Sequence, residues 1–311
     1  MSFSLLAGGL PAEPEQTAKP EQPPVKVFVL AGQSNMVGAG RVEGDPDHND
    51  GQGSLSYLVE HQADTFGHLK QGDDWAERDD VSIWYLGKTG MLRPGFGSND
   101  NTIGPELGFG GVVGDATEAP VLLIKIAWGG KSLGADFRPP SAGGKVGPFY
   151  TQLIDHATQT LENAETLFPE YEGRDFELVG FGWHQGWNDR INQQFNDEYE
   201  ENLVHFMNDI RRDLDAPELP FVVAETGMTG PEEKHPRALS LMAAQKAACE
   251  RDGHATFVPT RDFWRPEDES PSKQGYHWNS NAETYYLIGQ AMGEAMLKLT
   301  AGNQHAVQSA N

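Results

Sequence analysis

The sequence has a single cysteine, Cys249, among its 311 residues. One cysteine excludes an intramolecular disulfide and any metal site built from several thiolates. Cys249 falls on the apolar face of a predicted helix, in LSLMAAQKAACERDG, where a buried structural thiol is expected. The fold must therefore form without disulfides, whichever compartment the protein occupies.

Basic residues are also scarce, because 23 Lys and Arg stand against 46 Asp and Glu, for a formal net charge of -23. This excess argues against nucleic acid and anionic membrane surfaces as partners. No apolar run approaches the roughly 20 residues of a membrane span, and no phosphate-binding glycine motif occurs. We expect a soluble protein whose substrate is neutral or has its charge met locally. The sequence does not indicate an oligomeric state.

The first 24 residues lack a folded-domain pattern. MSFSLLAGGLPAEPEQ has a short apolar stretch and a small-residue LPA site, without a basic segment before it. The Pro- and Glu-rich AEPEQTAKPEQPP, which overlaps its end, is typical of disorder. We interpret residues 1–24 as a disordered leader or signal-peptide remnant, which favours a secreted or periplasmic protein, and residues 301–311 as a tail.

Between these ends the pattern predicts one α/β domain, from residue 25 to 300, without internal repeats. Apolar strands that alternate with helices predict a mainly parallel sheet covered on both faces. The expected strands are residues 25–31, 81–87, 121–128, 176–184 and 219–226, and the expected helices lie near 104–117, 148–168, 195–215, 237–252 and 281–299. In such sheets, ligands bind beyond the carboxyl ends of the strands.

The first strand, in VKVFVLAGQSNM, stops at a glycine and delivers Ser34 to that edge. A serine hydrolase needs a nucleophile, a base, and donors for the developing oxyanion. Ser34 is expected to begin a helix, so its N–H would be an unpaired first-turn donor. The alternative is that Ser34 only caps the helix. This stretch alone supports both interpretations equally.

Two of the ten histidines, His184 and His277, stand out by their context. His277 lies in GYHWNSNAETYY, on a loop that leads into the last helix, which a capping-box spacing of Ser280 and Glu283 would start. Packed against the end of the first strand, this loop would bring His277 to Ser34; a surface turn is the alternative.

Amides and glycines follow the other strands. GWHQGWND offers Gln185 and Asn188 as amide donors and Asp189 as an acid. In AWGGKSLGADFRPP, Gly129-Gly130 allows close backbone approach, although an ordinary turn at the end of a strand is the favoured interpretation of this pair alone. Trp128 and Phe137 are candidate sugar-stacking rings, with core packing as the equal alternative. DPDHNDG at 45–51 departs from a calcium loop, and a solvated acidic loop is favoured over a metal site.

Five motifs follow one another along the chain: GQSNM after a strand, GPELGFG at 104–110, AWGGKSL…FRPP at 127–140, WHQG at 183–186, and a late HWN. Together they resemble the sialate O-acetylesterase and acetylxylan esterase group of SGNH-type hydrolases, from about residue 25 to 299. The resemblance implies a three-layer α/β/α, flavodoxin-like fold with a mainly parallel five-stranded sheet, and neither metal nor organic cofactor.

The resemblance also implies roles for individual residues. Ser34 would be the nucleophile and His277 the general base. The oxyanion hole would consist of the Ser34 N–H, a glycine N–H of Gly129-Gly130, and the Gln185 side chain. We add five guesses for the substrate wall: Trp128, Lys131, Phe137, Arg138 and Trp187.

Two positions depart from the family pattern. Gln274 stands where the family usually carries aspartate, three residues before the histidine, and Trp187 stands where an acid is common. An amide accepts from imidazole N–H but does not stabilise imidazolium as a carboxylate would. Three possibilities stay open: Gln274 as an orienting residue, a substitute acid (Asp189, Asp268 or Glu269), and a Ser-His dyad.

The sequence therefore predicts a carbohydrate O-acetylesterase that acts on acetylated sugars through a serine nucleophile. A sialate-specific or general acyl esterase is the first alternative. The second is a carbohydrate-binding pseudoenzyme that lacks a full catalytic triad.

Overall fold

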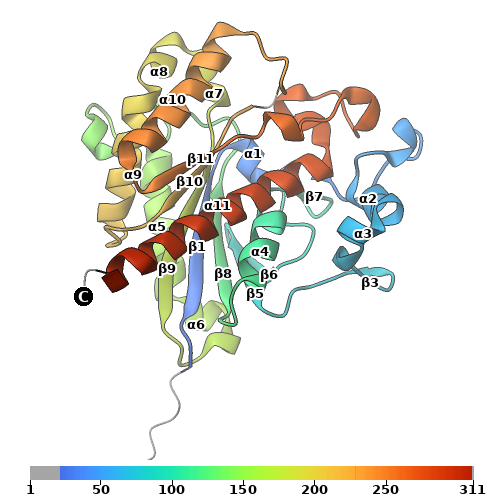
Figure 1. Cartoon of the computed structure of the whole chain (residues 1–311), viewed down its shortest axis with the longest axis horizontal. Helices are drawn as coiled ribbons and strands as arrows, with labels where there is room; N and C mark the ends of the chain where they lie inside the picture. Colours follow the sequence, from blue (N-terminus) through green and yellow to red (C-terminus); the bar gives the residue numbers. More distant parts are fainter. Residues whose placement is uncertain (1–21, 228, 310–311) are drawn as a thin grey trace, which may run out of the picture.

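A seven-stranded sheet forms the centre of the computed structural model, which describes residues 22–227 and 229–309 (Figure 1). The strand order is β11-β10-β9-β1-β8-β5-β6. All five predicted strands are present, as β1 (Val25–Gly32), β5 (Val81–Tyr85), β8 (Val121–Ala127), β9 (Phe176–His184) and β10 (Phe221–Ala224). The sheet is mainly parallel, as predicted.

The predicted count of five strands is wrong by two. β11 (Ala255–Val258) pairs in parallel with β10, and β6 (Lys88–Met91) pairs antiparallel with β5 through a turn at Leu86-Gly87. Both extra strands are four-residue edge strands without a fully buried face, so they lack the apolar run that marks the others.

Helices cover both faces of the sheet, in three layers (Figure 1). Phe28 and Leu30 of β1 belong to an apolar cluster with α4 (Glu106–Asp115) and α11 (Ala282–Ser309). Val27 and Val29, on the other face, belong to a cluster with α5 (Pro148–Glu162), α9 (Tyr199–Asp213) and α10 (Pro236–Asp252). The alternation of β1 side chains thus divides the core between two layers of helices.

The packing of α4 on α11 explains a glycine of the GPELGFG motif. A Cβ at Gly108 would lie 2.1 Å from the Tyr286 carbonyl oxygen, and a Cβ at Gly289 would lie 2.0 Å from the Pro105 carbonyl oxygen. The two helices approach closely because glycine stands at both positions.

Short elements complete the described chain. The helices are α1 (Ser34–Val37), α2 (Leu55–His61), α3 (Ala63–Phe66), α6 (Ala164–Leu167), α7 (Trp187–Ile191) and α8 (Gln193–Asp197). The two-stranded ladders are β2 (Gly40–Arg41) with β7 (Thr102–Ile103), and β3 (Lys70–Gln71) with β4 (Asp74–Trp75). The 3₁₀ turns are η1 (Asn49–Gly51), η2 (Gly67–Leu69), η3 (Pro140–Ala142), η4 (Pro169–Tyr171), η5 (Arg261–Phe263), η6 (Glu267–Glu269) and η7 (Gly275–Ser280).

The predictions for the two ends of the chain have different outcomes: the N-terminal leader is mostly outside the described residues, and the predicted C-terminal tail is helical as far as Ser309. The leader lies outside the described residues except for residues 22–24, which precede β1 without regular structure. The last helix continues to Ser309, past its predicted end at residue 299 and into the predicted tail. No helix in the described ranges is both long and apolar enough to span a membrane.

Candidate functional site

A cavity of about 410 Å³ opens at the carboxyl ends of the central strands. Its volume is in the range of small-molecule sites, about 300–1,000 Å³. Ser34, which follows β1, and Gly129, which follows β8, line it together with Gln274 and His277 from the loop before α11. Residues far apart in the sequence meet here because Gly32 of β1 is level with Ala127 of β8.

The end of β1 is a tight junction that only glycine satisfies. A Cβ at Gly32 would lie 2.2 Å from the His184 carbonyl oxygen of β9. The chain turns there, and Ser34, which is partly exposed, becomes the first residue of α1. The Ser34 N–H has no acceptor in the described part of the chain. A first-turn N–H without an intrahelical partner is a donor for a ligand.

The residues beside Ser34 tie it to two other loops. Gln33 is buried, and its Oε1 accepts from the Gly186 N–H at 3.0 Å while its Nε2 donates to Asn188 Oδ1 at 3.3 Å. These contacts join α1 to the loop after β9. Buried side-chain amides with both ends hydrogen-bonded fix the geometry of the segments that they join.

Asn35 makes the corresponding link to the histidine loop. Its Nδ2 donates to the Tyr276 carbonyl at 3.3 Å, and its Oδ1 accepts from the Tyr285 hydroxyl at 2.8 Å. The same hydroxyl lies 3.4 Å from the His277 carbonyl oxygen. The motif GQSN therefore holds the loop after β9 through its glutamine and the histidine loop through its asparagine, and leaves the serine facing the cavity.

His277 begins a strained turn. Trp278, Asn279 and Ser280 follow it with φ angles of 51°, 53° and 57°, and non-glycine residues in this region cost of order 1–3 kcal/mol each. The fully buried Trp278 ring and hydrogen bonds from the His277 and Asn279 N–H groups to the Gln274 carbonyl, at 2.7 and 3.1 Å, stabilise the turn. A turn so constrained holds the His277 backbone in one place.

The imidazole of His277 faces an amide. Its Nδ1 lies 3.4 Å from Gln274 Oε1, and no carboxylate within the described ranges contacts the ring. Burial lowers the pKa of His277 below its ordinary value of 6.5. Of the two residues considered for orienting His277, Gln274 contacts the ring, and Asp189 does not.

Asp189 and Gln185 form a buried brace rather than part of the cavity wall. Asp189 accepts from the Leu133 and Gly134 N–H groups, at 2.9 and 2.7 Å, and burial raises its pKa to about 6. Gln185 Nε2 donates to Asp189 at 2.6 Å and to the Lys131 carbonyl at 2.9 Å. Both amide hydrogens of Gln185 are therefore engaged inside the protein, which leaves none for an oxyanion. The amide nitrogen of Asn188, by contrast, has no partner in the described chain.

The two glycines after β8, Gly129 and Gly130, differ in their position relative to the cavity. Gly129 lies against Ser34, since a Cβ built on Gly129 would be 3.9 Å from the Ser34 Cβ, and its N–H has no acceptor within the described residues. Gly130 has a φ of 70° and open space around it, and it does not line the cavity. The Gly129 N–H thus lies next to the serine without an acceptor, whereas Gly130 adopts the positive φ of the turn.

None of the five predicted substrate-wall residues lines the cavity. Phe137 is fully buried and packs edge-to-face on Trp183, so its ring belongs to the core. Trp128 is partly buried against Phe137 and Phe149. Burial on these contacts accounts for both rings without a ligand.

The charged and remaining aromatic guesses also have protein partners. Arg138 donates to the Gly143 carbonyl at 2.8 Å and to Glu198 at 3.0 Å, and Lys131 lies over the Phe149 ring. Trp187 stacks with the Arg190 guanidinium and neighbours the ring of Tyr276 in the histidine loop.

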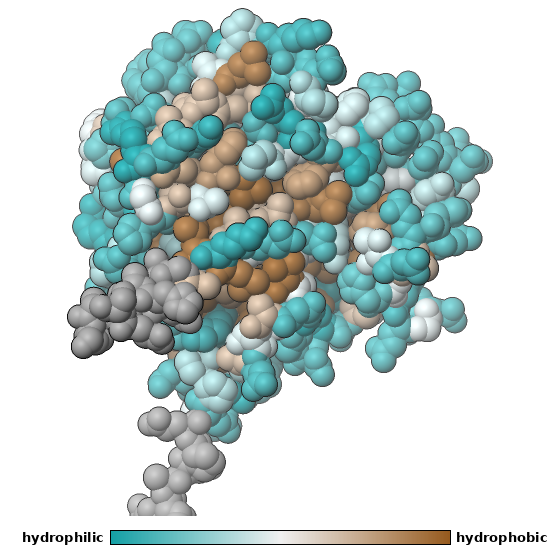
Figure 2. Space-filling model, viewed as in Figure 1, coloured by the Kyte–Doolittle hydropathy of each residue, from teal (hydrophilic) through white to brown (hydrophobic). Residues whose placement is uncertain are grey.

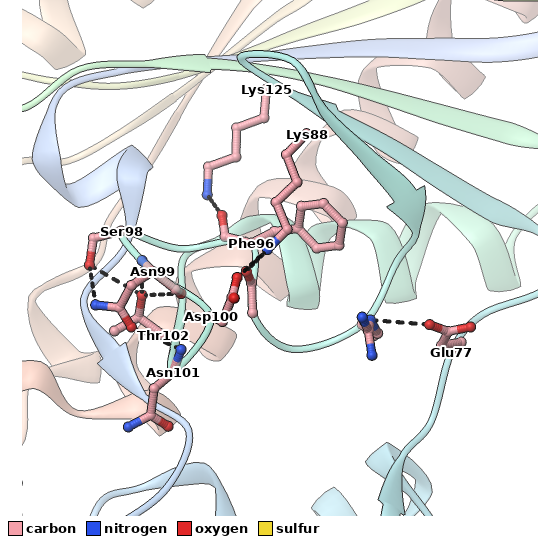
Figure 3. Close-up of polar contacts among 11 residues, drawn as sticks. Glu77, Lys88, Phe96, Ser98, Asn99, Asp100, Asn101, Thr102 and Lys125 are labelled. Carbon is pink, nitrogen blue, oxygen red and sulfur yellow. Dashed lines mark hydrogen bonds and ion pairs between the residues drawn. The ribbon is translucent and has the colours of Figure 1, made fainter. Parts of the chain in front are cut away.

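Part of the cavity wall comes from a loop that the sequence analysis did not select. Ser98, Asn99 and Thr102 line the cavity, with Arg41 of β2 beside them. Figure 3 shows this loop closed on itself by hydrogen bonds among the three residues, including the Asn99 N–H to Thr102 Oγ1 at 3.0 Å. Lys88 fixes its rim by donating to Asp100 at 2.6 Å. The stretch reads as an ordinary polar loop, and no periodicity marks it.

A buried ion pair holds this loop and α1 together. Lys125 and Glu106 are 2.7 Å apart, with both side chains fully buried, and burial lowers the pKa of Lys125. Lys125 Nζ also donates to the Val37 carbonyl at 2.8 Å, at the end of α1, and to the Phe96 carbonyl at 2.6 Å (Figure 3). The pair connects β8, α1, α4 and the cavity wall at one point.

Two other cavities flank α11, where Figure 2 shows apolar surface gathered on this face of the molecule. One, of about 870 Å³, lies at the opposite ends of the strands, near Lys26, Phe176 and Pro220, and the other, of about 440 Å³, lies beside the edge strand β11. Neither is lined by serine, cysteine or histidine. Among the described residues no cluster of three or more His, Cys, Asp and Glu is placed to hold a metal ion.

Comparison with known proteins agrees with this arrangement. A family model described as "Carbohydrate esterase, sialic acid-specific acetylesterase" matches residues 24–298. A solved protein from Arabidopsis thaliana has a TM-score of 0.58 at 16% identity, over 89% of this chain and 99% of its own. A carbohydrate acetylesterase from Xanthomonas citri has a TM-score of 0.53 at 14% identity, over 86% of this chain and 57% of its own. At these identities the structures show a shared fold. No curated protein matches the chain.

Proposed function

This chain belongs to the carbohydrate esterase family of sialic acid-specific acetylesterases, and from that premise we propose that it removes O-acetyl groups from sugars with Ser34 as the nucleophile. The observation that carries the proposal is the meeting of Ser34, Gly129 and His277 around one cavity at the carboxyl ends of the strands. Each comes from a different segment of the chain, and each has the chemistry that acyl transfer requires.

In the proposed reaction, Ser34 Oγ attacks the acetyl carbonyl carbon while His277 accepts the hydroxyl proton. Collapse of the tetrahedral intermediate breaks the ester C–O bond, and His277 returns the proton to the departing sugar oxygen. Water, activated by His277, then attacks the acetyl-serine and releases acetate. No cofactor is required by these steps.

The oxyanion is proposed to lie between the Ser34 and Gly129 N–H groups. Neither N–H has an acceptor in the described part of the chain, which supports this assignment. Gln185, the third donor that the family pattern implies, has both amide hydrogens engaged with Asp189 and the Lys131 carbonyl, so the proposal rests on the two backbone donors. One such donor is worth about 100- to 1,000-fold in kcat in a serine protease.

The His277→Ala variant tests the base. We expect kcat for acetate release from O-acetylated sugars to fall by about 100- to 10,000-fold, because His277 is the one histidine that lines the cavity with Ser34 among the described residues. Acetate would be measured directly for both enzymes. His254→Ala, which removes an exposed histidine just before β11, is the matched control and keeps wild-type turnover. Equal turnover by both variants would contradict the assignment of His277.

The pH profile tests the role of Gln274. His277 acts as a base in its neutral form, and burial lowers its pKa, so neutral imidazole persists into mildly acidic solution. We expect the acid limb of kcat/KM to have its midpoint below pH 6.5. In Gln274→Asp, a carboxylate near Nδ1 stabilises imidazolium, and the midpoint moves to higher pH. An unchanged midpoint in that variant would show that residue 274 does not contact the ring.

A binding-only protein is the second candidate, and the amide at His277 Nδ1 is the observation that favours it. It predicts that acetylated sugars bind without release of acetate, even at high enzyme concentration. Turnover of an activated acetate ester that depends on both Ser34 and His277 would exclude this candidate.

A further inference from the structure

The ring of Tyr276, the residue before His277, has no task in the proposed mechanism. With 45% of its surface accessible, Tyr276 is the most exposed Phe, Tyr or Trp of the described chain. Its hydroxyl makes no hydrogen bond with the described residues. Tyr276 does not line the cavity, but its neighbour His277 does. The exposed ring is therefore available to a part of the ligand that extends beyond the cavity.

Tyr276 belongs to a row of four side chains that starts at the cavity. Its ring centroid lies 4.6 Å from that of His277 and 6.2 Å from that of Trp187. The Arg190 guanidinium lies over the Trp187 ring, 3.5 Å from its centroid, and forms neither a hydrogen bond nor an ion pair with the described residues. We call these four side chains the aromatic row. It offers apolar ring faces and free hydrogen-bond donors side by side.

The aromatic row is held in place by the two residues that flank the nucleophile. Asn35 Nδ2 donates to the Tyr276 carbonyl at 3.3 Å, and Gln33 Oε1 accepts from the Gly186 N–H, just before Trp187, at 3.0 Å. The partly buried Trp187 ring also packs against the apolar core. The rings are therefore fixed relative to the nucleophile before a ligand binds, which lowers the entropic cost of binding.

We propose that the aromatic row is a subsite for a second sugar, which stacks on Tyr276 and is joined by a glycosidic bond to the acetylated sugar in the cavity. This inference rests on the proposed function of the cavity, and it makes the substrate a linked sugar rather than a free monosaccharide. The C–H face of a pyranose packs on an aromatic ring, and its hydroxyls accept from donors such as Arg190. Trp187 stands where the family commonly carries an acid, so the row is a feature of this chain.

Affinity for single and linked sugars tests the subsite. Binding would be measured calorimetrically for two unacetylated pairs, N-acetylneuraminic acid with sialyllactose and xylose with xylotriose. We expect wild type to bind the longer member of one pair about 10-fold more tightly than the single sugar, the effect of one well-placed aromatic contact. Tyr276→Ala is expected to bind both members of that pair equally, and Tyr276→Phe to keep the preference. Tyr57→Ala, which removes a partly exposed tyrosine stacked on His61, is the matched control and keeps it too.

Equal affinity of wild type for both members of each pair, or no binding of any of the four sugars, would overturn the proposal. So would a preference that survives in Tyr276→Ala. A preference lost in Tyr276→Phe would also overturn it, because stacking requires the ring and not the hydroxyl. These measurements require no turnover, so they test the aromatic row even if acetate release, measured separately, fails.

Discussion

Replacing Ser34 with alanine is expected to lower kcat for acetyl-ester hydrolysis by roughly 10⁴- to 10⁶-fold, the range found when a serine nucleophile is removed from a hydrolase. The hydroxyl is the group that forms the acyl-enzyme, and no neighbouring side chain of the cavity provides another nucleophile with the same N–H donors. Residual turnover would come from binding and the oxyanion donors alone. Acetate release under single-turnover conditions measures the effect.

The fold is expected to survive this change. Ser34 Oγ makes no hydrogen bond in the described chain, and α1 is held by the side chains on either side of it. Removal of one such hydroxyl changes the free energy of unfolding by about 0.5 kcal/mol or less. Urea unfolding of both proteins checks this, and a large loss of stability would make the loss of activity uninformative about chemistry.

Ser141→Ala is the sharpest control for the nucleophile. Ser141 Oγ lies 2.8 Å from His205 Nδ1, an exposed serine–histidine contact outside the Ser34 cavity. A serine and a histidine in contact do not catalyse acyl transfer without oxyanion donors and a substrate cavity. We therefore expect Ser141→Ala to keep wild-type kcat. Loss of activity in Ser141→Ala with activity kept in Ser34→Ala would transfer the catalytic role to the exposed pair.

The second large effect concerns stability. Lys125→Met removes the cation from a fully buried ion pair and leaves the Glu106 carboxylate without it. Breaking such a pair from one side costs about 3–5 kcal/mol, because the remaining charge stays buried. We expect a loss of that size in the free energy of unfolding, measured by urea titration. Activity should also fall, since Lys125 donates to the carbonyls that end α1 and shape the cavity wall.

A double-mutant cycle separates the pair from its surroundings. Lys125→Met combined with Glu106→Leu removes both charges, so we expect it to cost less than the sum of the two single changes. The exposed pair Lys246 and Glu250, 3.7 Å apart, is the control and is expected to contribute about 1 kcal/mol or less. Additive costs at Lys125 and Glu106 would show that the two charges do not interact.

Local pattern was enough to predict the strands that build the core. The strands β1 and β8 are apolar except for one lysine each, and such mostly apolar runs indicate burial on both faces of a sheet. The edge strands β6 and β11 were not predicted because an edge strand pairs with a neighbour on one side only and is less buried. Its formation depends on that neighbour more than on its own composition. The last helix was predicted too short for a related reason: its final turns carry few apolar residues.

The site divides in the same way. The turn from the first strand to Ser34 could be predicted because its glycine and serine are neighbours in the sequence. The hydrogen-bond partners of the amides after β9 could not be predicted. Gln185 and Asn188 stand three residues apart in one motif, and only the folded chain shows that the first is tied to Asp189 and Lys131 while the amide nitrogen of the second stays unpartnered. Side-chain direction at the end of a strand depends on contacts from distant segments, which composition does not encode.

By itself the sequence determined the alternation of strands and helices, the glycine at the end of β1, and the serine that follows it, because hydrophobic period and backbone freedom act over a few residues. The tertiary structure alone decided three things about the site. It placed an amide at His277 Nδ1, it turned Phe137 and Asp189 inward, and it brought Arg41 and the loop at 98–102 to the serine. Each of these placements depends on strand register and on packing between segments that are tens to hundreds of residues apart. The position of each side chain is therefore set by the distant residues that it contacts, which its own local sequence does not reveal.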